Sequence, residues 1–225
     1  MTENVKMKQG FFITGTDTGV GKTWATLALM HYFKQQGHSV VGMKPVAAGC
    51  EWAGKQLKNE DAVLLQEYSS VSLDYKEINP YALEMPVAPH LAARENVIDL
   101  DVIVTAFQKL QEKAEVVIVE GAGGWLVPLN EEKDLSAVVK ALGLPVILVV
   151  AIKLGCINHA RLTLQQLAAD EVQCAGWFAM CLDADMACIE ENIESIANRV
   201  SAPLLGVFPY TEKLDVDSLA SQIVL

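Results

Sequence analysis

The residues with the clearest chemistry form a glycine-rich segment between a short apolar run and an apolar-periodic segment, Gly15-Thr16-Asp17-Thr18-Gly19-Val20-Gly21-Lys22-Thr23. Glycines let the backbone turn tightly, so that successive N–H groups face one anion, and the positive end of the following helix faces the same point. Lys22 would then reach the terminal phosphates of a nucleotide, and the Thr23 hydroxyl would bind a magnesium ion. The order strand, loop, helix therefore predicts a phosphate-binding loop.

This loop is one residue longer than the common pattern. A glycine usually stands five residues before Gly21, but Thr16 occupies that position and the glycine is Gly15. A chance Gly-Lys-Thr in an ordinary turn is the alternative interpretation. The flanking strand and helix favour the phosphate loop, because the mechanism requires both.

Two further apolar runs end in charged residues. Residues 39–43 predict a strand that leads into Lys44, and residues 116–119 predict a buried parallel strand that leads into Glu120 and a glycine-rich turn. Open α/β sheets bind ligands at the carboxyl ends of their strands, and in phosphate-loop proteins an acidic residue on a second strand approaches the magnesium site. On spacing alone, Lys44 fits a solvated charge, and Asp61, in the first turn of a predicted helix, fits a partner of the helix dipole.

The rest of the chain alternates between strand and helix patterns. Apolar periodicity predicts helices at 24–36, from about 59, and at 91–96, 102–113, 135–142, 156–167, 189–200 and from about 215, and strands at 11–14, 146–152, 176–182 and 204–208. A mobile loop is expected at 47–58, and an irregular excursion across the sheet edge at 68–89. This alternation predicts an α/β fold of the P-loop nucleoside triphosphate hydrolase type, a mostly parallel sheet flanked by helices on both faces.

Composition limits the class of protein and its partners. With 225 residues, 52% of them hydrophobic, the chain fits one P-loop α/β domain over residues 1–225. A net charge of -11 argues against a nucleic-acid or anionic-membrane surface, which needs a basic footprint. The five cysteines contain no CxxC pair, residues 1–6 lack the apolar core of a signal peptide, and the apolar run 141–152 is too short to span a bilayer. We therefore expect a cytoplasmic protein with reduced thiols and small-molecule ligands.

Five segments together resemble one enzyme family. They are the loop 15–23, Lys44-Pro45-Val46, Asn79-Pro80-Tyr81, Glu120-Gly121-Ala122-Gly123-Gly124-Trp125 and Lys153-Leu154-Gly155-Cys156-Ile157-Asn158-His159. In this order and spacing they resemble the ATP-dependent dethiobiotin synthetases of biotin biosynthesis. The resemblance extends from the first strand to just beyond residues 203–206, which is nearly the whole chain.

The resemblance implies an ATP- and magnesium-dependent ring closure. In that family, one amine of diaminopelargonic acid captures CO2 as a carbamate, and the γ-phosphoryl group of ATP passes to the carbamate oxygen. The second amine then attacks the carbamic-phosphoric mixed anhydride and releases phosphate, which leaves dethiobiotin. Each step gathers negative charge in a small space, so the protein mainly positions the groups and supplies positive charge.

The same resemblance implies roles for individual residues. The catalytic residues would be Lys44, Lys22 and Thr18. Magnesium would be held by Thr23, Asp61 and Glu120, all oxygen ligands. The nucleotide would be bound by Gly19, Val20, Gly21, Lys22, Thr23, Trp24, Asp61, Glu120, Gly121, Ala122, Gly123, Pro209, Tyr210 and Thr211. The substrate would contact Thr18, Lys44 and Ala48, and its carboxylate would bind at the second subunit of a homodimer, at Gly155, Cys156, Ile157 and Asn158.

Three positions depart from the family pattern. Members often carry glutamate at Gly19, serine at Ala48, and at Met180 an asparagine that recognises adenine. Backbone groups or water could replace the first two contacts. A thioether cannot make the paired hydrogen bonds of an amide to a base, so we expect looser discrimination among nucleoside triphosphates.

Three other functions are alternatives. A nucleotide-switch ATPase of the partitioning or division-site type usually has a lysine at the position of Asp17 and a basic or amphipathic surface, and neither is present. An amidating ligase of the cobyrinic acid type is expected to need a further amidotransferase domain with a nucleophilic cysteine. A purely structural dimer is disfavoured, because the set of reactive residues is intact: Lys22, Thr23, Lys44, Asp61 and Glu120.

Overall fold

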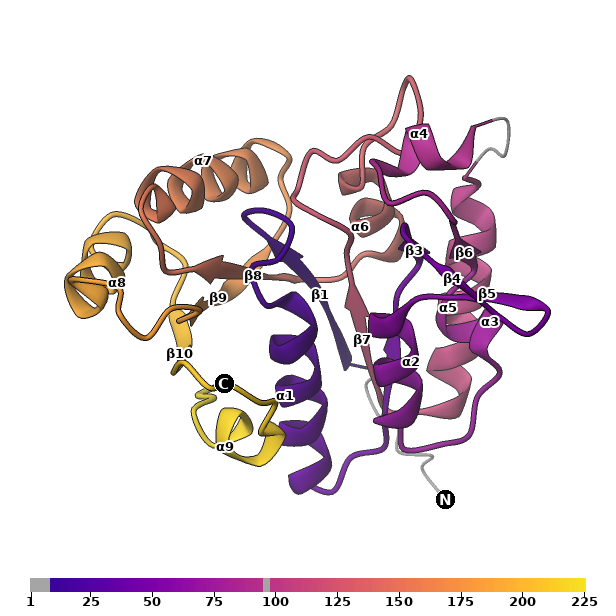
Figure 1. Ribbon diagram of the computed structural model, residues 1–225, viewed down its shortest axis with the longest axis horizontal. Helices are drawn as coiled ribbons and strands as arrows, with labels where there is room; N and C mark the ends of the chain where they lie inside the picture. Colours follow the sequence, from indigo (N-terminus) through magenta and orange to yellow (C-terminus); the bar gives the residue numbers. More distant parts are fainter. Residues whose placement is uncertain (1–8, 95–97) are drawn as a thin grey trace, which may run out of the picture.

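The centre of the fold is a six-stranded sheet in which every neighbouring pair is parallel (Figure 1). The computed structural model describes residues 9–94 and 98–225. The strand order is β10-β9-β8-β1-β7-β2. These strands are β1 (Gln9–Gly15), β2 (Val40–Met43), β7 (Val116–Glu120), β8 (Val146–Ala151), β9 (Cys174–Met180) and β10 (Leu204–Phe208). Parallel strands covered on both faces need apolar side chains on both, which explains their continuous apolar runs.

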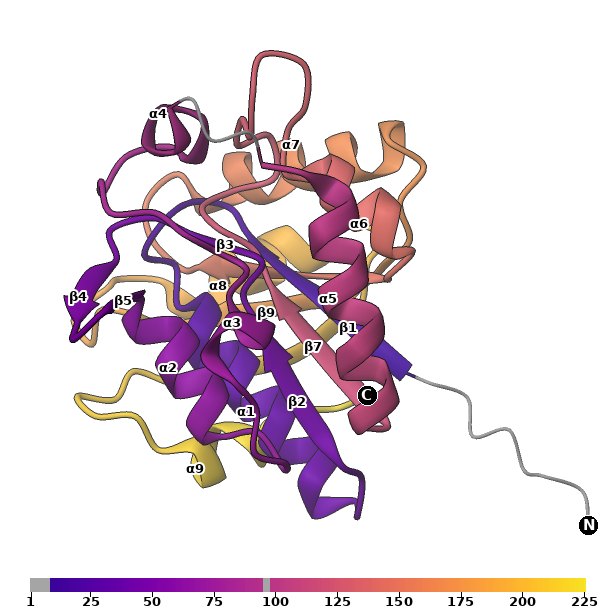
Figure 2. The same cartoon turned by 90° about the vertical axis from the view of Figure 1, so that its right-hand side faces the viewer.

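Helices cover both faces of this sheet, as predicted. The helices beside the sheet are α1 (Lys22–Gln35), α2 (Glu60–Glu67), α5 (Leu100–Lys113), α6 (Ser136–Leu142), α7 (Cys156–Ala169), α8 (Ile189–Ala197) and α9 (Val216–Ala220). Figure 2 shows α1, α2 and α9 on one side of the sheet and α5, α6 and α7 on the other. Buried side chains in the first half of α7 and in α8 form a separate apolar cluster with β8 and β9. The predicted P-loop α/β architecture is therefore confirmed.

Helix α1 ends where the sequence predicts. Gly37 has φ +87, its N–H bonds to Lys34 O, and the next N–H, of His38, bonds to Phe33 O. This pair of bonds is a Schellman motif, which needs a residue in the left-handed conformation that glycine adopts most readily. The chain then turns into β2, which delivers Lys44 to the carboxyl edge of the sheet.

The prediction of a mobile loop at residues 47–58 is wrong. The segment begins with β3 (Val46–Ala47) and continues as a hairpin of β4 (Glu51–Ala53) and β5 (Gln56–Lys58), turning at Gly54 with φ +68. Every residue of β4 is exposed. A strand without a buried face carries no alternating apolar pattern, so periodicity could not detect this hairpin.

The excursion at residues 68–89 also contains regular elements. It includes α3 (Tyr75–Ile78) and β6 (Tyr81–Ala82), which pairs in parallel with β3. Next comes α4 (Pro89–Ala93), which begins two residues before the predicted helix 91–96, because Pro89 stands at its first turn. The end of that predicted helix, at residues 95–96, lies outside the described residues, as does the amino-terminal segment 1–6.

The structure also bears on the thiols and on membrane-spanning helices. All five cysteines are free thiols, including Cys188, the one exposed member. Among the helices of residues 9–94 and 98–225, none combines the length and the apolar character that crossing a bilayer demands.

Candidate active site

A cavity of about 860 Å³ opens at the carboxyl ends of the sheet strands. Six parts of the chain contribute to it: the phosphate loop with the start of α1, the region around Lys44, the start of α2, residues 86–89, the loop after β7, and the ends of β9 and β10. The lining residues are Thr18, Gly19, Gly21, Lys22, Thr23, Trp24, Lys44, Ala48, Asn59, Glu60, Asp61, Leu64, Pro86, Val87, Ala88, Pro89, Glu120, Ala122, Gly123, Val127, Met180, Cys181, Leu182, Tyr210 and Thr211.

The glycines of the phosphate loop meet specific steric needs. Gly21 is the N-cap of α1 with φ +88, and a Cβ there would lie 2.7 Å from Met180 Cγ. A Cβ on Gly15 would lie 2.6 Å from Val20 Cγ2, which explains why the longer loop keeps its first glycine at this position. No side chain of the described residues caps the amino terminus of α1. Its first N–H groups are therefore available to an anion in the cavity.

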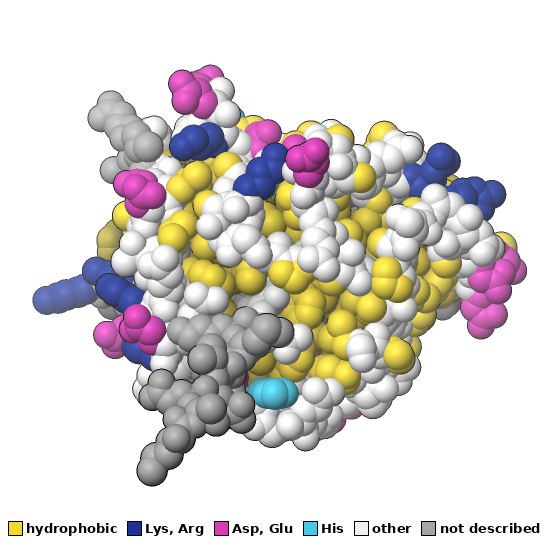
Figure 3. Space-filling view, turned by 180° about the vertical axis from the view of Figure 1, so that it is seen from behind, with side chains coloured by type: hydrophobic (Ala, Val, Ile, Leu, Met, Phe, Trp, Pro, Cys, Tyr) yellow, Lys and Arg dark blue, Asp and Glu magenta, His cyan; other side chains and the backbone are white. Residues whose placement is uncertain are grey.

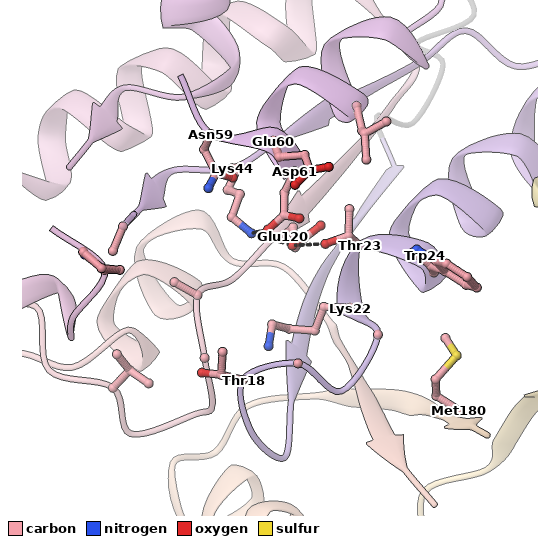
Figure 4. Close-up of a pocket in the computed structure, with 18 of the residues that line it drawn as sticks. Thr18, Lys22, Thr23, Trp24, Lys44, Asn59, Glu60, Asp61, Glu120 and Met180 are labelled. Atoms are coloured by element: carbon pink, nitrogen blue, oxygen red, sulfur yellow. Dashed lines mark hydrogen bonds and ion pairs between the residues drawn. The ribbon is translucent and has the colours of Figure 1, made fainter. Parts of the chain in front are cut away.

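Lys22 folds back over the loop and is 7% exposed. Its side chain lies in the cavity beside the loop (Figure 4), and its Nζ donates a hydrogen bond of 2.8 Å to Asp17 O. Among the described residues, no carboxylate lies within ion-pair distance of this ammonium. Burial lowers the pKa of Lys22 to about 8, against the opposing effect of the Glu120 charge. The lysine is thus close to the loop and lacks an anionic partner of its own.

Lys44 occupies the centre of a charge cluster. Its Nζ lies 2.6 Å from Asp61 Oδ2 and 2.6 Å from Glu120 Oε1. Burial opposes the charge of Lys44, but the two carboxylates outweigh it and raise the pKa of the ammonium. Burial likewise disfavours the charge of Asp61, yet Lys44 holds the pKa of this carboxyl below its ordinary value. The strand-end lysine is therefore a buried, charged group rather than a solvated one.

The carboxylates of this cluster fit a magnesium ion. Thr23 Oγ1 donates to Glu120 Oε1 at 3.0 Å, whereas Glu120 Oε2 is buried without a hydrogen-bond partner among the described residues. A hard cation prefers such oxygens, and an acceptor left unpaired in the interior calls for a ligand. Within residues 9–94 and 98–225, no three His, Cys, Asp or Glu side chains come together as a metal cluster. Such an ion would complete its shell with water and phosphate, as Mg²⁺ commonly does.

The opposite end of the cavity is apolar. Met180 is 1% exposed and lies on the other side of the phosphate loop from Lys44 (Figure 4). Cys181, Leu182 and Tyr210 line the same end, and the Thr211 hydroxyl already donates to Lys213 O at 2.8 Å. A nucleotide whose phosphates lie on the loop would place its base against this wall.

Most of the predicted site residues come together in the cavity, and some do not. Those that line it are Thr18, Gly19, Gly21, Lys22, Thr23, Trp24, Lys44, Ala48, Asp61, Glu120, Ala122, Gly123, Tyr210 and Thr211. Val20 is buried in the core, and Gly121 packs against Phe12 and Leu135. The other five, none of which lines the cavity, are Pro209, Gly155, Cys156, Ile157 and Asn158.

Sequence patterns missed part of the cavity wall. Residues 86–89 and Val127 line it, although nothing in their spacing distinguishes them from an ordinary loop. Asn59 is different, since its side chain caps α2 by accepting from Ala62 N at 3.3 Å. An asparagine before an apolar-periodic segment is a recognisable N-cap, so this residue could have been found.

The chain is similar in sequence to a family model and to curated proteins that share one name. A family model described as AAA domain matches residues 9–218. The chain is 51% identical over 220 residues to the ATP-dependent dethiobiotin synthetase BioD of Nitrosospira multiformis, covering 96% of this chain and 94% of the relative. It is 49% identical over 217 residues to the protein of the same name from Xanthomonas axonopodis pv. citri, covering 96% and 97%.

Solved structures share the fold at much lower identity. The MinC:MinD cell division protein complex of Aquifex aeolicus has a TM-score of 0.60 at 16% identity, covering 96% of this chain and 86% of that one. Cobyrinic acid a,c-diamide synthase from Mycobacterium smegmatis, with bound ADP and magnesium, has a TM-score of 0.58 at 15% identity, covering 96% and 92%. At such identities the likeness shows a common P-loop architecture and no common activity.

Proposed function

This chain belongs to the ATP-dependent dethiobiotin synthetase family, and from that premise we propose how its cavity performs the reaction. The chain is an ATP-dependent cyclo-ligase of biotin biosynthesis. Its substrates are diaminopelargonic acid, CO2 and ATP. The observation that carries the proposal is the position of the Lys44 ammonium, 2.6 Å from Asp61 and from Glu120 in the cavity that the phosphate loop lines.

The proposed reaction has three bond-making steps. One amine of the substrate adds to CO2 and loses a proton, which gives a carbamate. A carbamate oxygen takes the γ-phosphoryl group as ADP departs, and the second amine then attacks the carbamate carbon, loses a proton and expels phosphate. Lys44 would neutralise the carbamate and the γ-phosphate, while Thr18 lies near the amines and Lys22 stabilises the transferring phosphoryl group.

The proposed cofactor is Mg²⁺, held by Thr23, Asp61 and Glu120. Its support is the buried Oε2 of Glu120, which has no hydrogen-bond partner in the part of the chain that the structure describes, together with a donor set made only of oxygens. When bound, this ion would neutralise charge on the β- and γ-phosphates. The loop backbone from Gly19 to Gly21 and the first turn of α1 would surround the phosphates.

We also propose a cytoplasmic homodimer with active sites at the subunit interface. The face that carries α5, α6 and α7 presents a broad apolar area (Figure 3). Leu162 on α7 is 57% exposed, and Leu126 and Leu154, in the loops after β7 and β8, are 55% and 98% exposed. A large exposed apolar area favours an interface. The start of α7, at Gly155 to Asn158, would then bind the substrate carboxylate in the partner's site. Light scattering of the purified protein tests the dimer, and a monomeric mass would contradict it.

A coupled assay tests the reaction itself. Purified protein is supplied with ATP, magnesium, bicarbonate and diaminopelargonic acid, while mass spectrometry follows dethiobiotin and ADP release is measured with and without the diamine. We expect diamine-dependent ADP release that Lys44→Ala abolishes and that Lys55→Ala, on the exposed β4–β5 turn, leaves intact. ATP hydrolysis at the same rate with and without the diamine, with no cyclic urea formed, would overturn the proposal and favour the nucleotide-switch ATPase.

A further inference from the structure

The backbone of Lys44 is held from outside the main sheet. Strand β2 is the edge strand of the described sheet, with a neighbouring strand, β7, on one side of it, and Lys44 lies directly after its end. Its N–H donates to Ile78 O at 2.8 Å, and its carbonyl accepts from Asn79 Nδ2 at 2.7 Å. Residues at the end of α3 thereby replace the missing strand.

Asn79 is itself fixed by a buried tyrosine. Asn79 is 2% exposed, and its Oδ1 accepts a 2.9 Å hydrogen bond from the Tyr75 hydroxyl, one helical turn earlier. Its Nδ2 also donates to Tyr81 O at 3.2 Å. A buried amide with three of its four hydrogen bonds made has a single orientation, so the carbonyl of Lys44 has a fixed position.

The same tyrosine reaches the element that carries Asp61. The Tyr75 hydroxyl accepts a 2.7 Å hydrogen bond from Asn59 N, and Tyr75 is 5% exposed. Asn59 is the N-cap of α2, and Asp61 lies in the first turn of that helix. A continuous chain of hydrogen bonds therefore runs from the Lys44 carbonyl through Asn79 and Tyr75 to the start of α2.

We propose that Tyr75 and Asn79 are positioning residues, which hold the Lys44 backbone and the first turn of α2 at the separation that the reaction requires. This inference rests on the proposed function, because it concerns the same Lys44 and Asp61. The 2.6 Å ion pair between these two side chains also joins the elements, but it must loosen when the ammonium turns to the substrate. Hydrogen bonds between neutral groups are indifferent to that change, so they keep the two backbones in place while the charges rearrange.

Two tyrosine hydroxyls permit a matched test. Tyr75→Phe removes the link between Asn79 and α2. Tyr81→Phe, in the same part of the fold, removes a hydroxyl that accepts from Asp99 N at 2.9 Å and lies outside the chain of bonds. Supporting groups of this kind typically affect activity or metal affinity by about 10- to 100-fold, so we expect Tyr75→Phe to lower kcat by that factor. Tyr81→Phe should stay within about twofold of wild type.

A binding measurement separates this inference from the assignment of the reaction. Fluorescent nucleotide is titrated with and without Mg²⁺. We expect Tyr75→Phe to weaken the Mg²⁺-dependent part by about 10-fold or more, while affinity without Mg²⁺ is retained, since the phosphate loop is untouched. If wild type makes no dethiobiotin, the reaction assignment fails and this titration still tests the positioning role. Equal behaviour of Tyr75→Phe and Tyr81→Phe in both kcat and Mg²⁺ dependence would overturn the inference.

Hydrogen exchange on the wild-type protein provides a readout that needs no variant. The Tyr75 hydroxyl is the partner of the Asn59 N–H, and the chain of bonds predicts slow exchange of this amide relative to the exposed β4–β5 turn. Exchange as fast as in that turn would contradict the proposal even if Tyr75→Phe failed to fold. Asn79→Ala, which cuts the other end of the chain, should reproduce the loss of Mg²⁺ dependence.

Discussion

Lys22 is predicted to destabilise the protein in the absence of nucleotide. Lys22 is 7% exposed, and within residues 9–94 and 98–225 its ammonium has one hydrogen-bond partner, the backbone oxygen of Asp17. Replacing it in Lys22→Met removes the buried charge and keeps most of the apolar stem. We therefore expect the variant to unfold at higher urea concentration than wild type near pH 7, although it loses the residue that we propose to contact the nucleotide phosphates.

The size of the effect follows from the pKa of Lys22, which burial lowers from 10.5 to about 8. One pKa unit corresponds to about 1.4 kcal/mol, so the charged form costs the folded state about 3 kcal/mol below pH 8. The lost hydrogen bond to Asp17 offsets about 1 kcal/mol, which leaves a gain of about 2 kcal/mol for the variant at pH 7. Between pH 8 and 10.5 the unfolded chain binds more protons than the folded one, so wild-type stability rises and the gain disappears.

Urea unfolding at pH 7 and near pH 10, without nucleotide or Mg²⁺, measures this difference. Lys55→Met is the control, because Lys55 lies exposed in the β4–β5 turn and its replacement should change the free energy of unfolding by less than about 0.5 kcal/mol. If Lys22→Met were less stable than wild type at pH 7, or if its advantage were equal at both pH values, the reasoning from burial would be refuted.

Three further changes, at Lys44, Met180 and Gly21, test other parts of the cavity, and Gly37→Ala is the control for the last. Lys44→Met leaves the Glu120 carboxylate buried without its ammonium partner, so urea unfolding should show that the free energy of unfolding falls by about 3–5 kcal/mol. Adding Glu120→Gln should recover most of this loss, and equal stability of the single and double variants would contradict the reasoning. Wild type should turn over ATP, CTP and GTP at comparable rates. Met180→Asn offers an amide to the base, so competition assays should show a preference for ATP over CTP and GTP that is about 10-fold stronger than in wild type. Gly21→Ala places a Cβ 2.7 Å from Met180 Cγ at φ +88 and should weaken nucleotide binding by about 10-fold or more. Gly37→Ala, at φ +87 with open space around it, should lower stability without changing that affinity.

The parts of the site that sequence predicted are those fixed by local patterns. Lys44 and Glu120 each follow a buried apolar run, and the ends of parallel strands share one edge of the sheet. Neighbouring positions in the sheet then follow from β2 pairing with β7. The phosphate loop was predictable for the same reason, because its strand, glycines and helix are consecutive in the chain. Spacing alone favoured plain roles for Lys44 and Asp61, and the resemblance to a family was needed to join them.

The parts that sequence could not predict depend on contacts between distant segments. Strands β3 and β6 each have two residues and exist only because they pair across more than thirty positions. The hydrogen bond from Asn79 to the Lys44 carbonyl spans 35 positions. Such contacts leave no periodicity within a single segment, since each partner contributes one residue. Residues 86–89 likewise line the cavity only because the folded chain brings them next to residues that are distant in the sequence.

The two buried lysines of the cavity, Lys22 and Lys44, differ in the groups that interact with their ammonium charges in the free protein. Lys44 is paired with Asp61 and Glu120, so its charge is satisfied before any substrate arrives. Among the described residues Lys22 has one hydrogen-bond partner, a backbone carbonyl, and burial lowers the pKa of its ammonium. A polyphosphate on the loop would supply the missing anion, so part of its binding energy comes from removing an unfavourable state of the free protein. Lys44 gains nothing comparable until an anionic ligand competes with these carboxylates for its ammonium. Its contribution should therefore appear in kcat, whereas that of Lys22 should appear already in nucleotide affinity.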